Sequence, residues 1–255
     1  MEQKPLRIVS LNVGRKNPFG KLALRMTHRR LPDIVCLQEV LQSRIDHLAK
    51  LGYKTGQVAD YQHIGGQSGF VTTGVRSAQS IISVEKARYY DSSIAVPWAF
   101  IYQKVAKLRE RHEGLVTTFR RNGEKYRVVN LHLSTACGPR VRISQLTKML
   151  QRFADGKTIF CGDFNIVSDM MFKIVAGWAC GYSLGDYFYD ERKEVNKIVK
   201  DYHLQNPFAH LKTTNYPFHQ QLDHILIPEG MKIVRKRMFK VPISDHKALL
   251  VDLAI

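Results

Sequence analysis

Cysteine is scarce in this sequence. The 255 residues include four cysteines, and none of them forms a Cys-x-x-Cys pair or a Cys/His pattern with zinc-ligand spacing. Composition therefore excludes a structural zinc centre and a dithiol redox motif. Cys36 and Cys161 lie inside apolar runs, where a thiol is expected to be a small core side chain. Cys137 and Cys180 lie in loop-like sequence, and a disulfide between them is expected only in an oxidising compartment.

Long hydrophobic runs, repeats and linkers are also missing. No apolar run approaches the ~20 residues that a membrane-spanning helix needs. No apolar leader precedes Leu6, so a cytoplasmic location is expected. No repeat, low-complexity tract or Pro/Gly-rich linker divides the chain. The sequence therefore predicts one domain over residues 1–255, present as a monomer, and long enough to bury a sizeable core.

Acidic residues are few relative to basic ones. The chain has 39 Lys and Arg against 22 Asp and Glu, a formal net charge of +17. The basic residues gather in Arg25–Arg30, Lys104–Arg111, Arg120–Arg127 and Lys232–Lys240. Such a field attracts polyanions and raises association rates. Many basic patches are only solvated faces, but an excess of this size favours nucleic acid, and DNA in particular, over a neutral small molecule.

Short apolar runs alternate with segments of helical periodicity along the chain. Strands are expected at Leu6–Asn12, Asp33–Leu37, Gly69–Thr73, Leu115–Phe119, Tyr126–Leu133, Thr158–Cys161, Leu222–Ile227, Lys232–Lys240 and Lys247–Leu253, and helices at Lys21–Arg30, at Ser43–Leu51 and after Pro139. Ser43 is a plausible N-cap and Gly52 a helix stop. Asn122-Gly123 predicts a hairpin turn. The alternation predicts two sheets face to face, covered by helices.

Polar side chains follow or begin most of these apolar strands. Strand ends are where rigid sheets present side chains to a cleft, and a carboxylate beside a buried strand is costly unless it is paired or metal-bound. The residues that share this placement are Asn12, Glu39, His132, Asp163, Asn165, Asp223, Asp245 and His246. Most have a structural alternative: Asn12 as a turn cap, Glu39 as a helix start, Asp163 as a turn residue, His132 as a core histidine and Asp245-His246 as an ion pair at a strand entrance. Such alternatives at six strand ends of one chain are much less plausible than any one alone.

The motifs that these residues form stand in a characteristic order. They are Leu11-Asn12, Gln38-Glu39, Asn130-Leu131-His132-Leu133, Gly162-Asp163-Phe164-Asn165, Leu222-Asp223-His224-Ile225 and Ser244-Asp245-His246. This ordered set resembles the endonuclease/exonuclease/phosphatase superfamily, over nearly the whole chain. The resemblance implies an α/β (α+β) fold, a four-layer sandwich of two mixed β-sheets packed face to face and flanked by helices. It also implies a metal-dependent phosphodiesterase.

The resemblance further implies a Mg²⁺ or Mn²⁺ cofactor. Glu39 would be its principal ligand with Asn12 beside it, and Asp245 would stabilise the metal or the surrounding site. Hard carboxylate and amide oxygens suit these ions, which keep several waters and bind substrate phosphate directly.

The remaining residues would act on the phosphate. The resemblance implies that Asp163 orients or deprotonates the attacking water and that Asn165 holds the phosphate or that water. His246, kept in its tautomer by Asp223, would donate to a phosphate oxygen. His132 would contact the phosphate or assist the leaving oxygen. No serine or cysteine has a recognisable nucleophile setting, so we expect direct in-line attack by water.

Several substrates remain open within this superfamily. His132 and Gly14 stand where apurinic endonucleases have Tyr and Asp, which argues against an abasic-site enzyme. The charge favours a DNA endonuclease or exonuclease. The alternatives are a phospholipid or phosphoinositide phosphodiesterase resembling sphingomyelinases, a repair enzyme resembling tyrosyl-DNA phosphodiesterases, and a non-catalytic nucleic-acid-binding scaffold.

Three further expectations concern the surroundings of the site. The acidic partner of His132 is unassigned, with Glu85, Asp91 and Glu113 as candidates. Arg140 and Arg142 are predicted either to face the cleft or to be solvated helix-start charges. Aromatic side chains that stack on bases or pack in the core are expected at Trp178, Tyr182, Tyr187, Phe188 and Tyr189, and an apolar loop that touches a membrane at Met170, Met171 and Phe172.

Overall fold

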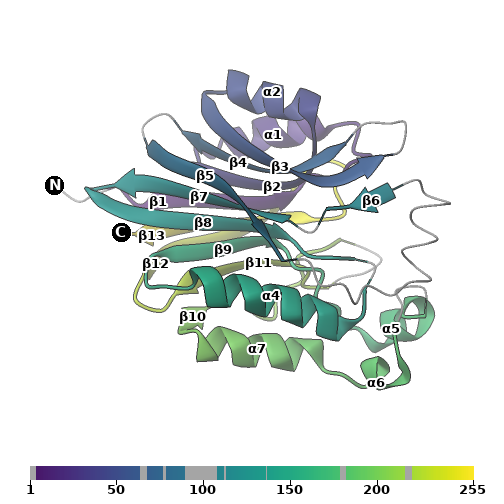
Figure 1. Ribbon diagram of the computed structural model, residues 1–255. Helices are drawn as coiled ribbons and strands as arrows, with labels where there is room; N and C mark the ends of the chain where they lie inside the picture. Colours follow the sequence, from purple (N-terminus) through teal and green to yellow (C-terminus); the bar gives the residue numbers. More distant parts are fainter. Residues whose placement is uncertain are drawn as a thin grey trace.

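The molecule is built from four layers (Figure 1). In the computed structural model, the residues described are 4–63, 68–76, 79–89, 108–111, 113–135, 137–178, 182–215 and 220–255. Two β-sheets form the inner layers, and helices cover the outer face of each. This arrangement confirms the predicted fold class.

The first sheet has seven strands in the order β12-β13-β1-β2-β4-β3-β6. Their bounds are β1 Leu6–Asn12, β2 Ile34–Leu41, β3 Tyr53–His63, β4 Gly69–Arg76, β6 Leu108–Glu110, β12 Lys232–Lys240 and β13 Lys247–Ala254. β1 and β2 are parallel and the other neighbours are antiparallel, so the sheet is mixed.

The second sheet has six strands in the order β10-β11-β9-β8-β7-β5. Their bounds are β5 Ser80–Arg88, β7 Glu113–Arg121, β8 Glu124–His132, β9 Thr158–Asp163, β10 Leu204–Gln205 and β11 Asp223–Pro228. β8 and β9 are parallel, which again makes the sheet mixed. The β7–β8 hairpin turns at Asn122 and Gly123, whose φ angles of 51° and 84° are those that a tight hairpin turn requires.

Helices close the sandwich on both outer faces. α1 (Gly20–His28) and α2 (Gln42–Lys50) pack on the first sheet, and α4 (Pro139–Phe153) and α7 (Glu191–Asp201) pack on the second. The short helices α5 (Met170–Ala176) and α6 (Leu184–Tyr187) lie beside α4 and α7 in Figure 1. No helix in the described ranges is long and apolar enough to cross a membrane.

Three large apolar clusters, and a small one of Val58, Val71 and Leu115, hold the layers together. The central cluster joins the two sheets, with Ile8 and Cys36 from the first meeting Cys161 and Ile225 from the second. A second cluster packs the second sheet against α4 and α7, and a third packs the first sheet against α1 and α2. Cys36 and Cys161 are buried free thiols, as predicted. Cys180 lies outside the described residues, so the pairing with Cys137 that an oxidising compartment would allow stays untested.

The topology brings the predicted strand ends to one edge of the sandwich. β1, β2, β8 and β9 end there, at or just after Asn12, Leu41, His132 and Asp163. β11 is antiparallel to β9 and β13 is antiparallel to β1, so both strands begin at that same edge. Six segments far apart in the sequence therefore deliver their polar ends to a common place.

Several local expectations need correction. β2 runs to Leu41 rather than ending at Leu37, and α2 begins at Gln42. Leu41 is the N-cap of α2 and makes no side-chain capping bond, so Ser43 is not the cap. β3, β5, β6 and β10 were not predicted. In β5 most side chains are exposed, because this strand forms an edge of its sheet and carries little apolar periodicity.

Candidate active site

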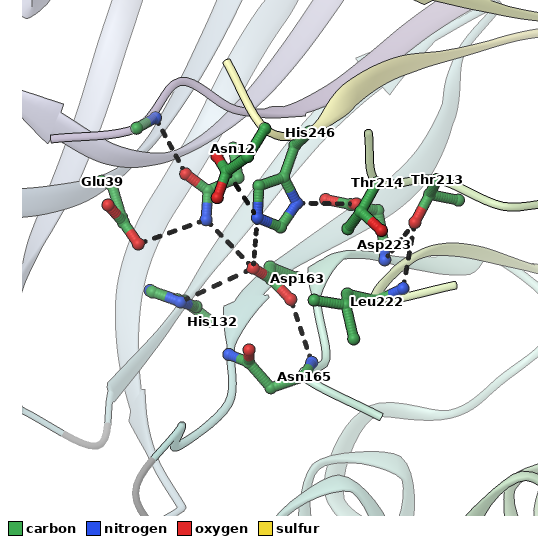
Figure 2. A network of polar contacts seen from close by, with 12 residues as sticks. Asn12, Glu39, His132, Asp163, Asn165, Thr213, Thr214, Leu222, Asp223 and His246 are labelled. Carbon is green, nitrogen blue, oxygen red and sulfur yellow. Dashed lines mark hydrogen bonds and ion pairs between the residues drawn. The ribbon is translucent and has the colours of Figure 1, made fainter. Parts of the chain in front are cut away.

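Asp163 stands at the centre of the polar residues that meet at this edge (Figure 2). Its side chain is buried at the end of β9. Oδ2 accepts a hydrogen bond from Asn12 Nδ2 at 3.0 Å, and Oδ1 accepts one from the Asn165 backbone N–H at 2.9 Å. Asn165 has a φ of 52°, and its amide donates to Leu133 O at 2.8 Å, which fixes the turn after β9.

Two histidines flank Asp163 from opposite segments. His246 Nε2 lies 3.6 Å from Asp163 Oδ2, and His132 Nε2 lies 3.8 Å from the same oxygen. Both distances are longer than a hydrogen bond, so neither Nε2 is committed to Asp163. Figure 2 shows both rings directed at this carboxylate. Two imidazole donors therefore face one small region beside a buried acid.

Each histidine is oriented by its own carboxylate. His246 Nδ1 pairs with Asp223 Oδ2 at 2.9 Å, as the sequence predicted. His132 Nδ1 pairs with Asp60 Oδ2 at 2.8 Å. In both cases the Nδ1 contact leaves Nε2 to face the site. Thr213 Oγ1 accepts the backbone N–H of Asp223 at 3.0 Å and so anchors the start of β11.

Asp60 is the functional residue that sequence reasoning missed. Of the three candidate partners of His132, Glu113 pairs with Arg88 and Glu85 is exposed on β5, so neither is the partner, and Asp91 lies outside the described residues. Asp60 lies on β3, where the register with β4 shifts between Ala59 and Tyr61. Such an irregularity redirects a side chain. The polar, glycine-interrupted sequence of β3 gave no strand signal that would have drawn attention to Asp60.

The electrostatics favour charged imidazoles beside a charged Asp163. Burial lowers the pKa of His246, but the Asp223 and Asp163 carboxylates outweigh it and raise the value to about 10. Burial likewise opposes protonation of His132, yet Asp60 and Asp163 hold its pKa well above the usual value. Burial would raise the pKa of Asp163, but the charges on the two histidines lower it. Near neutral pH the cluster is two imidazolium groups around a carboxylate.

Glu39 has no cationic side-chain partner among the described residues. It sits where the register of β2 with β4 shifts between Leu37 and Val40, and its φ of 55° is uncommon outside glycine and asparagine. Oε1 accepts from Asn12 Nδ2 at 3.4 Å, and Oε2 accepts from the Arg15 backbone N–H at 2.9 Å. No lysine or arginine among the described residues forms an ion pair with it. A half-buried carboxylate in this position suits a divalent cation.

Asn12 and Asp245, the other two residues predicted to bind the metal, occupy different positions in the cluster. The Asn12 amide nitrogen faces both Glu39 and Asp163, while its oxygen accepts from the Gly14 backbone N–H at 3.0 Å. Asn12 therefore spaces the two carboxylates in this structure. The Asp245 side chain is 67% exposed, and its Oδ1 lies 3.9 Å from His246 Nε2. It stands at the rim of the cluster rather than inside it.

Asp163, Asp223 and His246 offer ligand atoms within 4.8 Å of one another, a second geometry that would hold a metal ion. Mg²⁺ and Mn²⁺ prefer oxygen ligands, and this trio offers an imidazole nitrogen together with a carboxylate, Asp223, that already pairs with His246 Nδ1. The Glu39 carboxylate is therefore the better candidate ligand for a cation. The trio is better suited to transferring protons and stabilising charge on a phosphate.

The sequence matches the model of the endonuclease/exonuclease/phosphatase family over residues 9–246, from β1 to His246. The chain belongs to this family. Its members are hydrolases that act on phosphoester bonds. The match spans every residue of the cluster described above, from Asn12 to His246, so the family assignment and the geometry of the cluster agree. No curated protein matches the sequence.

Solved structures of other members share the fold. An endonuclease/exonuclease/phosphatase from Beutenbergia cavernae superposes with a TM-score of 0.72 at 16% identity, covering 99% of this chain and 72% of that one. D. rerio TDP2 complexed with a single-strand DNA product gives 0.64 at 17% identity, covering 99% and 100%. ANGEL2, a 2′,3′-cyclic phosphatase, gives 0.65 at 16%, covering 98% and 95%. At these identities the likeness concerns the fold.

The two arginines predicted near the cleft have other positions. Arg142 is buried in α4 and pairs with Glu191 of α7, with Nε to Oε1 at 2.8 Å, so the prediction that it faces the cleft was wrong. Arg140 is exposed, lies 3.4 Å from Asp186 Oδ1 and stacks on the Tyr189 ring at 4.6 Å. Neither contacts a member of the cluster around Asp163.

Proposed function

We propose that this member of the endonuclease/exonuclease/phosphatase family is a divalent-metal-dependent phosphodiesterase that hydrolyses nucleic acid, most favourably DNA. One observation carries the chemistry: the buried Asp163 lies between two imidazole Nε2 atoms, each oriented by its own carboxylate. Phosphodiester hydrolysis needs a base for water, donors for the extra charge on phosphorus and help for the leaving oxygen. The cluster holds one group for each task.

In this proposal the chain's own residues divide the work. Asp163, kept ionised by its neighbours, orients the attacking water and accepts its proton. His246 donates from Nε2 to a non-bridging phosphate oxygen, and His132 donates to the leaving oxygen. Asn165 and Asn12 hold Asp163 in place. Attack is in line, without a covalent intermediate.

Glu39 is the residue that would hold Mg²⁺ or Mn²⁺, with Asp245 at the rim and Asn12 spacing the carboxylates. The cation would neutralise charge on the phosphate and activate it as a Lewis acid. The half-buried Glu39 carboxylate, which lacks a basic side-chain partner among the described residues, supports this assignment.

The charge of the chain supports a nucleic-acid substrate. With 39 basic and 22 acidic residues, the protein attracts a phosphate backbone strongly at low ionic strength. TDP2 has been solved with a single-strand DNA product, and another family member of similar fold is the endonuclease domain of a telomere-specific retrotransposon. Both are likenesses of fold, and they are compatible with DNA as the polymer bound here.

A lipid headgroup is the second candidate, favoured by one surface feature. Large apolar side chains are exposed on and around α5 and α6: Met170, Met171, Ile174, Val175, Trp178, Leu184 and Phe188. An apolar area of this kind marks an interaction surface more often than a solvated face. The apolar loop expected at Met170–Phe172 is in fact the start of α5, and Phe172 is partly buried.

A substrate panel decides between these candidates. Plasmid, single-stranded DNA, RNA, a 5′-tyrosyl oligonucleotide, sphingomyelin and a phosphoinositide are each incubated with Mg²⁺ or Mn²⁺, and with EDTA as the control. We expect metal-dependent cleavage of DNA that weakens as salt rises. Activity confined to lipid headgroups would refute the nucleic-acid assignment. A chiral phosphorothioate diester tests the in-line route, which requires inversion; retention would contradict it.

A further inference from the structure

Four lysines line one margin of the molecule next to the candidate active site. Lys236 and Lys240 lie on β12, which forms the edge of the seven-stranded sheet, and Lys247 begins the neighbouring strand β13. Lys212 lies in the segment that precedes β11. We call Lys212, Lys236, Lys240 and Lys247 the lysine strip. Its members come from three separate segments, so the fold rather than a basic run in the sequence gathers them.

The strip begins at the catalytic cluster. Lys247 directly follows His246, and its backbone N–H donates to Thr213 O at 2.7 Å. His246 itself bridges to Thr214, so the segment that carries Lys212 runs alongside the start of β13. The Lys247 ammonium donates to Lys212 O at 2.7 Å, and this bond ties the side chain to the neighbouring segment.

Two of the lysines face each other in an arrangement that is unfavourable without an anion. Lys240 and Lys247 are direct cross-strand partners in the β12–β13 ladder, and like charges in that relation are destabilising. Within the described residues, none of the four lysines forms an ion pair with an acidic side chain. The protein therefore concentrates positive charge here without compensating it.

The spacing of the strip suits the phosphate backbone of a polynucleotide. Lys236 and Lys240 are four residues apart and share one face of β12, a separation of about 13 Å along an extended strand. One strand of a DNA duplex carries a phosphate every ~3.4 Å of helix axis, so this length spans about four phosphates. The Lys236 ammonium donates to Pro207 O at 2.6 Å, which fixes the far end of the strip.

A simpler role for edge lysines is to prevent pairing with another sheet. That role accounts for Lys236 and Lys240 on the edge strand. It does not account for Lys247, whose strand is paired on both sides, or for Lys212, which lies outside the ladder. These two residues are also the members nearest to His246.

We propose that the lysine strip is a backbone-phosphate subsite, which binds the polynucleotide strand to one side of the scissile phosphodiester. The assignment rests on the proposed function, and it predicts preference for a polymer over an isolated phosphodiester. Recognition is by charge along the backbone, so it is insensitive to base sequence.

The test is DNA binding in EDTA, where hydrolysis is suppressed. Fluorescence anisotropy of a labelled oligonucleotide, titrated at several salt concentrations, gives the slope of log Kd against log[salt]. The double variant Lys240→Gln/Lys247→Gln is expected to lower this slope by about 1.4–1.8, because each lost phosphate contact contributes roughly 0.7–0.9. Lys240→Arg/Lys247→Arg retains both charges and is expected to keep the wild-type slope.

The matched control removes two charges elsewhere. Lys125 on β8 and Lys197 on α7 are exposed, and Lys125→Gln/Lys197→Gln is expected to leave the slope as in the wild type. Equal reductions in both Gln doubles would overturn the proposal, because net charge alone would then set the slope. Reduced binding to phosphatidylserine vesicles in Lys240→Gln/Lys247→Gln, with an unchanged DNA slope, would also overturn it.

The two proposals fail in different ways. DNA hydrolysis by the wild type with an unchanged salt slope in Lys240→Gln/Lys247→Gln refutes the subsite and leaves the proposed function standing. DNA binding with the expected slope change, but without hydrolysis of any phosphodiester, refutes the function and leaves the subsite standing. Absence of DNA binding by the wild type at low salt refutes the subsite outright.

Discussion

Two buried networks of charged groups differ in how many of their hydrogen-bond and ion-pair partners lie inside the protein. In the first, Arg142 and Glu191 join α4 to α7 with two bonds, Nε–Oε1 at 2.8 Å and Nη2–Oε2 at 3.1 Å. Arg142 also donates to Cys137 O at 2.7 Å and Tyr182 Oη at 2.8 Å, and Glu191 accepts from Val167 N–H at 3.0 Å. Every charged group there has its partners inside the protein.

The second network, around Asp163, is left open. Both histidine Nε2 atoms stop short of hydrogen-bonding distance to Asp163, and Glu39 has no basic side-chain partner in the described residues. Burial and strongly shifted pKa values occur in both networks, so neither property alone marks a functional site. The networks differ in the hydrogen-bond donors and acceptors that remain to bind a ligand.

The largest effect expected from this comparison is on stability. Arg142→Met leaves the buried Glu191 carboxylate without its cationic partner, and we expect a loss of about 3–5 kcal/mol in the free energy of unfolding. The measurement is urea denaturation followed by circular dichroism. Arg140→Met, at an exposed position two residues away, is the control and should cost much less. Arg142→Met/Glu191→Leu should recover most of the loss; a double variant no better than the single would contradict the account.

Substitutions in the network around Asp163 should affect activity more than stability. Asp163→Asn is expected to reduce kcat by about 10² or more, because it removes the proposed base for the attacking water. The measurement is release of 4-nitrophenolate from bis(4-nitrophenyl) phosphate with Mg²⁺. A thermal melt serves as the control for folding, since the midpoint should fall less than in Arg142→Met. Near-normal turnover would exclude the role assigned to Asp163.

A smaller effect is expected at Asp60, which positions His132 without touching the substrate. Asp60→Asn should lower kcat by roughly tenfold, in the range typical of residues that orient a site group. It should also shift the basic limb of the pH–rate profile to lower pH, because the carboxylate that raises the pKa of His132 is gone. Glu113→Gln, at the rejected candidate, is the control and should change neither quantity.

The smallest expected effect concerns pH and stability at His224. This buried ring stacks on Phe164 at 4.9 Å, and burial together with Arg192 holds its pKa well below 6.5. As pH falls below 6.5 the unfolded chain takes up a proton that the folded chain refuses, so stability decreases by up to 1.36 kcal/mol per pH unit. Denaturation at pH 7.5 and pH 5.5 measures this loss, which should be smaller in His224→Gln. An identical pH dependence in both proteins would contradict this account.

Sequence reasoning recovered what is local or periodic. β1 spans the predicted Leu6–Asn12, α4 begins at Pro139, and the β7–β8 turn falls on Asn122 and Gly123. Residues at strand ends could be grouped because each flanks an apolar run and because their motifs stand in an order that resembles the family. Their exact roles remain proposals.

What the sequence could not reveal depends on partners far away along the chain. Asp60 is 72 residues from His132 and lies on a strand with little apolar periodicity. Arg142 pairs with a residue 49 positions away, so its burial is not visible in the local pattern around Pro139. In both cases the fold creates the contact.

The most direct test of the central claim is the metal dependence of Glu39→Gln. Initial rates on bis(4-nitrophenyl) phosphate are measured as Mg²⁺ is titrated into metal-stripped wild type and variant. If Glu39 is the acidic residue that holds the cation, the variant requires a much higher Mg²⁺ concentration for half-maximal rate, and both proteins are inactive in EDTA. Equal Mg²⁺ dependence in the two, or full activity of the wild type in EDTA, would contradict it.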